Sequence, residues 1–119
     1  MHFRVKHADI VVILDLNPNV HDFRKLEARL EKLFEPVLLG LEGGTGIPIE
    51  IFTVKAKDCL GKLTKAVEIE MEVSDIALAK AMSMGNHLAR EFKAKCDEVS
   101  ISLRACFAEV RIPTGYSFC

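Results

Sequence analysis

The alternation of apolar and polar residues changes period several times along the chain, and each change marks an expected element. Segment 9–16 is an almost unbroken apolar run rich in β-branched residues, which is typical of a strand that lies centrally in a sheet. Asn17-Pro18-Asn19 ends this strand, because Pro has no N–H to donate and Asn favours turns. The first expected element is therefore a buried strand.

From Val20 the apolar residues recur three and four positions apart, with charged residues between them, which predicts an amphipathic helix. Glu35-Pro36 is expected to end or kink this helix, because Pro lacks the N–H and its ring clashes with the preceding turn. One more turn over 37–39 then leads into the glycines of 40–46. Phosphate-binding loops run from a strand into a helix, whereas this segment precedes a strand, so we interpret it as a flexible turn.

Two strands and a second helix follow. Segments 48–55 and 66–73 have the composition and alternation of strands, and the polar segment between them predicts a hairpin. Ser74-Asp75 is expected to cap a helix whose apolar stripe runs to about Lys95. Gly85 lies in the middle of this helix, which predicts close packing against the sheet.

The last part of the chain alternates again, but the alternation changes phase. Its apolar residues have odd numbers up to Leu103 and even numbers from Ala108 to Ile112. A slip of one residue turns every side chain to the opposite face, so a bulge or bend is expected near 105–107. We therefore expect a fourth strand followed by an extra strand at the C-terminal end.

The order of these elements is β-α-β-β-α-β with an extra C-terminal strand. It predicts an α+β fold, a two-layer split β-α-β sandwich of the ferredoxin-like type. The two crossovers of helical length place the first and third strands at the centre of the sheet and the helices on one face. At 119 residues the chain is expected to be a single domain, 1–119, with one core.

The face that the helices do not cover is expected to carry the side chains of the opposite parity. These positions are Val11, Ile13 and Asp15; Glu50, Phe52 and Val54; Glu68, Glu70 and Glu72; and Ser100, Ser102 and Arg104. Antiparallel pairing of the third strand beside the first is expected to bring Glu68 toward Asp15. Glu72 and, from the fourth strand, Arg104 are expected near Val11.

Five of these residues are candidate catalytic residues: Asp15, Glu68, Glu70, Glu72 and Arg104. Neighbouring carboxylates raise one another's pKa and can act as acid and base, which suits proton transfer in an isomerase or a lyase. The same set suits the binding of a cationic or metal-linked ligand. Alternating Glu on an outer sheet surface is also ordinary for a solvated face.

Several positions on this face are too apolar for contact with water alone, which favours a homo-oligomer with ligand sites at subunit boundaries. The leading hypothesis is therefore an oligomeric small-molecule-binding domain, and a non-catalytic interaction or assembly domain is the alternative. An RNA-binding module comes third. Sixteen basic and seventeen acidic residues give a formal charge of −1, which argues against nucleic acid as a partner.

Composition and motifs bear on the expected cellular location of the protein and on the cofactors it could bind. No apolar run is long enough for a membrane span and no secretory signal is recognisable, so a cytoplasmic location is expected. The absence of Gln beside plentiful Glu, Lys and Arg favours a thermophilic source, although four cysteines argue against it. These cysteines are scattered without a C-x-x-C pair, which favours free thiols over a metal site: Cys59, Cys96, Cys106 and Cys119. No P-loop, Rossmann fingerprint, nucleophile elbow or zinc pattern is present, so the sequence names no cofactor.

The element order resembles that of tautomerase-like isomerases, amino-acid-binding regulatory domains and RNA-recognition modules. For the tautomerases, the resemblance implies catalysis by a Pro directly after Met1, and His2 stands there. For RNA-recognition modules, it implies stacking aromatics on the central strands, whereas the third strand is expected to expose three glutamates. The resemblance is therefore one of element order alone.

Overall fold

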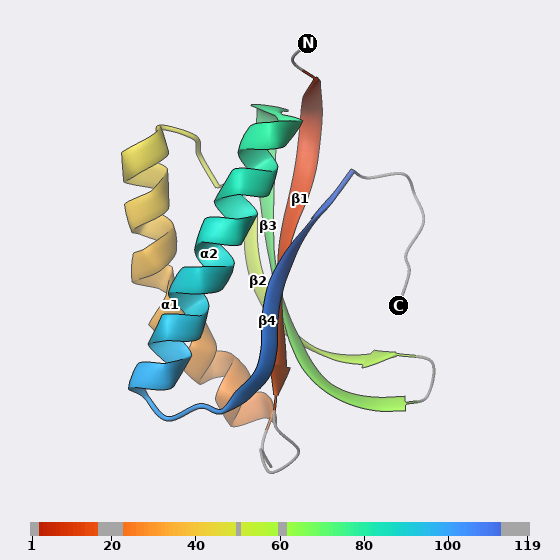
Figure 1. Ribbon diagram of the computed structural model, residues 1–119, viewed down its shortest axis with the longest axis vertical. Helices are drawn as coiled ribbons and strands as arrows, with labels where there is room; N and C mark the ends of the chain where they lie inside the picture. The colour runs from red at the N-terminus through yellow and green to blue at the C-terminus, as the bar shows by residue number, and fades with distance from the viewer. Residues whose placement is uncertain (1–2, 17–22, 50, 60–61, 113–119) are drawn as a thin grey trace.

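A computed structural model describes residues 3–16, 23–49, 51–59 and 62–112 of the chain. Within them, strands and helices alternate in the expected order (Figure 1). The strands are β1 (Arg4–Leu16), β2 (Ile51–Cys59), β3 (Lys62–Ala77) and β4 (Leu103–Arg111), and the helices are α1 (Phe23–Thr45) and α2 (Leu78–Glu98).

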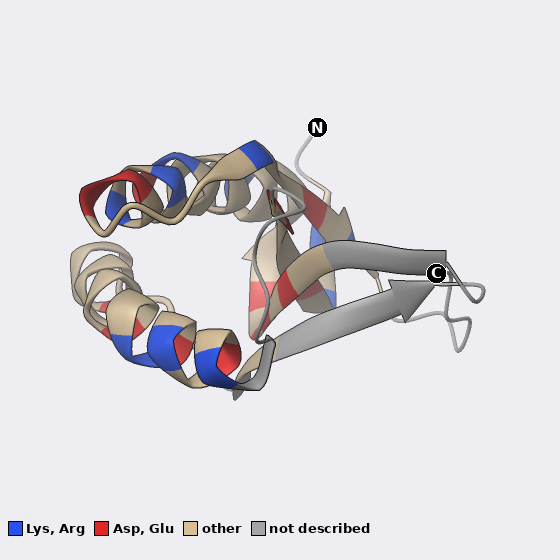
Figure 2. Cartoon of the chain, turned by 90° about the horizontal axis from the view of Figure 1, so that it is seen from below, with Lys and Arg blue, Asp and Glu red and all other residues tan. Residues whose placement is uncertain are grey.

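The four strands form one sheet in the order β2-β3-β1-β4, and every neighbouring pair is antiparallel. Both helices lie on one side of the sheet (Figures 1 and 2), and strands β2 and β3 curve away from them (Figure 1). The central strands are β1 and β3, so the predicted ferredoxin-like α+β fold is confirmed. No helix in the described part of the chain is long and apolar enough to cross a membrane.

The layer between sheet and helices is filled by alternate residues of the two central strands. These residues are almost completely buried: Ile10, Val12, Leu14 and Leu16 on β1, and Val67, Ile69, Met71 and Val73 on β3. Phe34 of α1 and Phe92 of α2 stack with their ring centroids 4.0 Å apart, so the helices also pack against each other. Alternation in the sequence had predicted the core positions of both strands.

Helix α1 continues well beyond the point where the sequence predicted its end. Pro36 lies inside it, and Figure 1 shows the helix axis changing direction partway along its length. The helix includes Gly40 and ends at Thr45, whose hydroxyl donates to the carbonyl of Leu41 at 2.8 Å. Gly46 follows with φ of 69°, the left-handed conformation common after helix ends. The expected flexible turn over 40–46 is therefore mostly helix.

The predicted cap of α2 is wrong. Strand β3 runs through Ser74 and Asp75, and the N-cap of α2 is Ala77, which has no side-chain cap hydrogen bond. Pairing with β1 continues on both sides of Asp75, which has a positive φ of 48°, up to Ala77, which lies opposite Arg4. The backbone pairing outcompetes the local capping preference of Ser and Asp.

The phase change in the last strand has a structural counterpart. The register of β4 against β1 shifts between Ala105 and Leu103, so the irregularity lies at Arg104, just before the predicted 105–107. Within the described residues, 108–111 belong to β4 and do not begin a separate strand, and Ile112 lies just beyond its end. Gly85 packs closely against the sheet, as predicted, since a Cβ there would lie 3.1 Å from the Cβ of Ala108.

Candidate functional site

The open face of the sheet, on the side away from the helices, carries the acidic residues of β3. Glu72 lies opposite Asp9 in the register of β1 and β3, Glu70 opposite Val11, and Glu68 opposite Ile13. The predicted pairing of Glu68 with Asp15 and of Glu72 with Val11 is therefore wrong by two residues. Because a shift of two preserves parity, the three glutamates still lie on the open face. Figure 2 shows acidic positions on the strands at the centre of the molecule.

The predicted contribution of β2 to this face is wrong. Val54 lies opposite Ile69 and so occupies a position on the helix-covered face, whereas the side chain of Phe52 lies outside what the structure describes. Val54 is partly buried against the core. Thr53, opposite Glu70, takes a position on the open face instead. Glu50 lies outside the described residues.

Arg111, at the end of β4, connects the acidic side chains of the open face. Its guanidinium lies 3.2 Å from Glu68 Oε1, 3.1 Å from Glu109 Oε2 and 3.9 Å from Glu70 Oε1. Partial burial works to lower the pKa of Arg111, but the hydrogen bonds that its guanidinium donates to Glu109 and Glu68 raise the pKa overall above its ordinary value. The guanidinium therefore stays charged and joins β4 to β3 across β1.

This cluster explains why Val11 is fully buried on an open face. Val11 lies between Glu70 on β3 and Glu109 on β4 in the two registers. The Arg111 side chain reaches from β4 to Glu68 across β1 and covers apolar surface with its stem. The Glu68 side chain is itself only 8% exposed, an unusual burial for a carboxylate. The centre of the open face is thus a packed polar cluster.

Asp15 and Arg104 form a separate ion pair at the other end of the face. Arg104 Nη2 lies 2.9 Å from Asp15 Oδ1, and both side chains are substantially exposed. The prediction that Arg104 lies near Val11 is wrong, because the shifted register places it beside Asp15. Ser100 and Ser102 precede β4, so the prediction that they lie on the open sheet face is wrong.

Asp9 and Glu72 face each other directly across the central strands. Both are partly buried, and within the described residues neither has an ion-pair partner. Like charges directly opposite each other destabilise a sheet. Of the five predicted site residues, the structure therefore brings Glu68, Glu70 and Glu72 into one row and sets Asp15 and Arg104 apart. Asp9, Glu109 and Arg111 also lie on this face and were not among the five predicted site residues.

The described part of the chain offers neither a metal site nor a reactive thiol. No group of three or more His, Cys, Asp or Glu residues there could hold a metal ion. Cys96 and Cys106 are free thiols, as expected, and Cys106 Sγ donates to the carbonyl of Ala89 at 3.1 Å. Burial raises the pKa of Cys96 to about 12 and that of Cys106 to about 11, so both remain protonated and poorly nucleophilic. Cys59 and Cys119 fall outside what the structure describes at the side-chain level.

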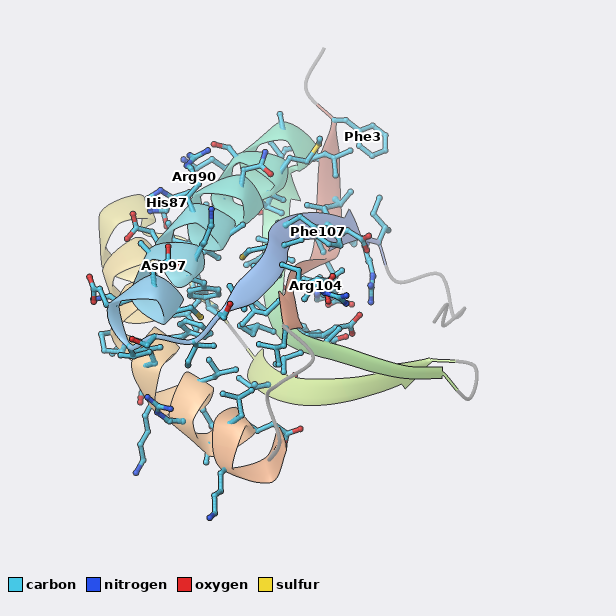
Figure 3. All side chains as sticks on the ribbon, turned by 60° about the horizontal axis from the view of Figure 1, so that its bottom comes forward. Phe3, His87, Arg90, Asp97, Arg104 and Phe107 are labelled. Atoms are coloured by element: carbon cyan, nitrogen blue, oxygen red, sulfur yellow. The ribbon has the colours of Figure 1, made fainter. Side chains whose placement is uncertain are left out.

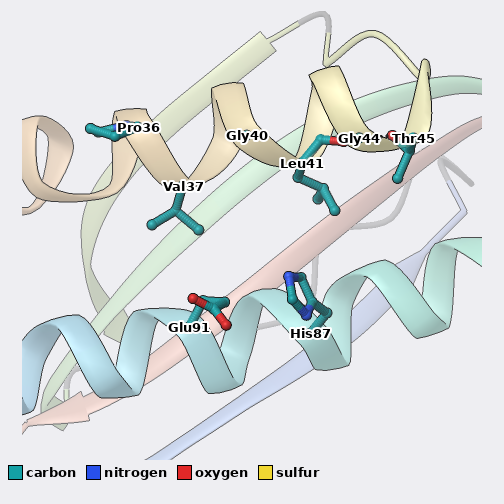
Figure 4. Close-up of a pocket in the computed structure, with 8 residues that line it drawn as sticks. All are labelled: Pro36, Val37, Gly40, Leu41, Gly44, Thr45, His87 and Glu91. Atoms are coloured by element: carbon teal, nitrogen blue, oxygen red, sulfur yellow. Dashed lines mark hydrogen bonds between the residues drawn. The ribbon is translucent and has the colours of Figure 1, made fainter.

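A groove of about 410 Å³ lies between the two helices (Figure 4). His87 and Glu91 point into it from α2, and Gly40 and Gly44 leave the opposite wall of α1 open. A Cβ at either glycine would meet no atom within 4 Å. The sequence did not predict this groove, because Gly40 and Gly44 were expected in a flexible turn and not in a helix. Both polar side chains are exposed, so we assign it no ligand.

No model of a known protein family matches the chain, and no curated protein matches it. A solved structure that is similar is the crystal structure of a dimeric protein of unknown function and ferredoxin-like fold from Bacteroides fragilis NCTC 9343. The two are 12% identical, the match covers 88% of this chain and 94% of that chain, and the TM-score is 0.49. The fold class of the present chain follows from its own sheet order and helices. The chain is an α+β sandwich with a ferredoxin-like fold and an acidic open sheet face.

Proposed function

We propose that the chain binds a small, positively charged organic molecule on the open face of the sheet, at Asp9, Glu70 and Glu72. The observation that carries this proposal is the direct opposition of Asp9 and Glu72 on the two central strands. Arg111 lies opposite Asp9 on β4, but its guanidinium forms its ion pairs with Glu68, Glu70 and Glu109, so neither Asp9 nor Glu72 has an ion-pair partner among the described residues. A bound cation would relieve their repulsion, and such relief is a source of binding free energy.

The charge of the surrounding cluster supports a cationic ligand. Arg111 lies near three carboxylates, those of Glu68, Glu70 and Glu109. Asp9 and Glu72 add two more carboxylates on the same face. The local field therefore favours an ammonium or guanidinium group and disfavours anions, phosphate esters of RNA among them.

The apolar part of the face supports an organic ligand over a bare ion. Ile13 is partly buried and lies opposite Phe107 in the register of β1 and β4. The Phe107 side chain is 45% exposed, and an aromatic ring can hold a cation or a hydrocarbon chain against its face. An amine with a short hydrocarbon body matches this combination of carboxylates and apolar surface.

An isomerase- or lyase-type reaction would add proton transfer to this binding. Glu68 and Asp15 are each held by a guanidinium at about 3 Å, so they act as partners of Arg111 and Arg104. Glu72 has no such contact in the described residues and is the group that we assign as the proton acceptor. The binding proposal stands without this step.

Thermal unfolding with 1,4-diaminobutane, and with succinate as the anion of matched length, tests the proposal. The diamine at about ten times its Kd is expected to raise Tm by roughly 5 °C, because it binds only the folded chain. Succinate is expected to leave Tm unchanged. An equal rise with both compounds, or none with either, would contradict a cation site.

Asp9→Asn and Glu72→Gln separate binding from general charge effects. Each variant removes the repulsion, so the ligand-free protein is expected to gain about 0.5 kcal/mol while its response to the diamine is lost. Glu35→Gln, at an exposed position on α1, is the matched control and should respond like the original chain. A diamine response that survives in Asp9→Asn and Glu72→Gln would place the ligand elsewhere.

A further inference from the structure

β4 is an edge strand of the sheet. The strand order ends with β2 on one side and β4 on the other, so the outer side of β4 pairs with no strand in the described part of the chain. Alternate backbone N–H and C=O groups of an edge strand point outward, and another extended strand complements them. β4 presents nine residues at this edge, Leu103–Arg111.

Helix α2 forms a groove along this edge. Gly85 brings the helix close to Ala108, so the neighbouring residues of the helix extend over β4. The groove has a volume of about 370 Å³ and is lined by Met82, Asn86, Ala108, Glu109 and Val110. A strand added to β4 would place its helix-facing side chains in this groove.

Large apolar side chains are exposed on both sides of the same edge. Met82 on α2 is 53% exposed, Ile112 at the end of β4 is 43% exposed, and Phe107 lies on the open face (Figure 3). Ile112 directly follows β4 and has the parity of Val110, so an extension of the strand by one residue would turn it to the helix-facing side. Single exposed apolar residues are common, but a group along an unpaired edge is typical of an interaction surface.

The other edge strand has a different composition. β2 carries Lys55 and Lys57 within its length. Lysines on an edge strand oppose the addition of another strand and are a common protection against it. The two edges of the sheet therefore differ, and β4 is the one open to pairing.

We infer that two copies of this chain associate through antiparallel pairing of β4 with β4, about a two-fold axis at Val110. The inferred pairing covers 108–112: Glu109 lies opposite the partner's Arg111, and Ala108 lies opposite the partner's Ile112, which directly follows the end of β4. Each strand thus presents an acid and a base that match its own reversed copy. The two sheets join into one, and each Met82 covers the partner strand in the groove.

The strand's own charge pattern selects a second copy as the occupant. Glu109 and Arg111 are two residues apart and lie on the same face of β4. Only an antiparallel copy is certain to bring a base opposite each acid in both directions. A foreign peptide would need the same spacing of opposite charges.

Sedimentation velocity and hydrogen exchange on the ligand-free chain test the inference. At 100 μM the protein is expected to sediment as a dimer, with β4 amides protected more than at 1 μM. The amides of β2, the other edge strand, should exchange equally at both concentrations. A monomer at 100 μM, or a dimer that protects β2 and not β4, would overturn the inference. Because no ligand is present, the outcome is independent of the proposed cation site.

Ile112→Lys is expected to raise the dimer dissociation constant at least ten-fold, because it places a charge in the apolar groove of the partner. Leu39→Lys is the matched control, since Leu39 is 60% exposed on α1, far from the β4 edge in the fold. An equal effect of both substitutions, or no effect of Ile112→Lys, would reject the β4 interface.

A disulfide scan tests the register. Val110 lies opposite itself, so Val110→Cys should give a 110–110 cross-linked dimer on oxidation with diamide, identified by mass spectrometry of its peptides. Ala105→Cys, also on β4 but away from the axis, should give no 105–105 link. A 105–105 link without a 110–110 link would contradict the stated register.

Discussion

Among the glycines of the described residues, Gly85 is the one where an added Cβ would meet other atoms, because α2 lies close to the sheet there. An added Cβ would lie 3.1 Å from Ala108 Cβ and 3.2 Å from Ile10 Cγ2, and both neighbours belong to packed strands. Gly85→Val is therefore expected to lower the free energy of unfolding by about 2 kcal/mol through overpacking. Urea denaturation followed by far-UV circular dichroism measures this change.

Gly40→Ala provides the matched control for Gly85→Val. Gly40 is also inside a helix, but a Cβ there would meet no atom within 4 Å. Ala favours the helix over Gly, so this variant is expected to gain up to about 1 kcal/mol. If Gly40→Ala lost as much stability as Gly85→Val, the backbone freedom of glycine, and not close packing, would explain why glycine occupies both positions.

At the residue scale, the sequence predicted which face of the sheet a side chain occupies better than it predicted which side chains touch. The two-residue period of a strand is a property of the backbone, so alternation alone assigned the core residues of β1 and β3. It did not identify Arg111, because the position of that side chain depends on the irregularity at Arg104. The opposition of Asp9 and Glu72 depends on register, which alternation does not determine.

Pro36 is the feature of helix α1 that most opposes its continuation. Pro lacks the N–H that would donate to the carbonyl four residues earlier, and it is strongly unfavourable inside a helix. Because Pro36 is exposed, its ring contributes little to the core. Pro36→Ala is therefore expected to raise the free energy of unfolding by about 2 kcal/mol, partly offset by the freer unfolded chain.

Urea denaturation of Pro36→Ala measures this gain, and Glu35→Ala is the control for a general effect of Ala at this exposed turn. The control removes no proline and should change stability by less than about 0.5 kcal/mol. Unchanged or lower stability in Pro36→Ala would mean that the bend of α1 is needed for its packing on the sheet.

At the element scale, local signals predicted the existence of each helix but not its ends. The stripe of α1 continues past Pro36 with Val37, Leu38 and Leu41, and Leu38 is only 5% exposed. Burial of these residues against the sheet offsets the cost of Pro and Gly in the helix. At the start of α2, pairing of Ala77 with Arg4 likewise outweighs the capping preference of Ser74 and Asp75.

At the scale of the whole molecule, topology followed from the sequence because two helical crossovers leave few arrangements of four strands. Register did not follow, since the connections between strands determine it. The face predicted for Val54 was wrong for the same reason: the hairpin register places it opposite Ile69. The acidic row of the open face was predicted, whereas its neighbours on β2 and β4 were not.

The thiols of Cys96 and Cys106 lie where the helix layer meets the sheet. Because folding raises the pKa of both, the fold is expected to lose stability at alkaline pH. Burial is the main cause that raises the pKa of Cys96 on α2, and Cys106 and Asp97 raise it further. Burial also raises the pKa of Cys106 on β4, and Lys93 partly opposes this. Both folded values, about 12 and about 11, exceed the ordinary value of 9.0 that applies to the unfolded chain.

Below pH 9 both thiols are protonated in the folded and the unfolded chain, so their contribution to stability is complete. Above pH 9 the unfolded chain loses protons that the folded chain retains, and the free energy of unfolding is expected to fall by up to about 1.4 kcal/mol per pH unit for each thiol. The loss should continue to about pH 11, where the folded Cys106 begins to ionise. Cys106→Ser keeps a donor for the Ala89 carbonyl without a titrating thiol, so its urea-denaturation profile between pH 8 and 11 should have roughly half the slope attributed to the thiols. Equal slopes in the variant and the original chain would assign the alkaline loss to lysines and not to the thiols buried between α2 and β4.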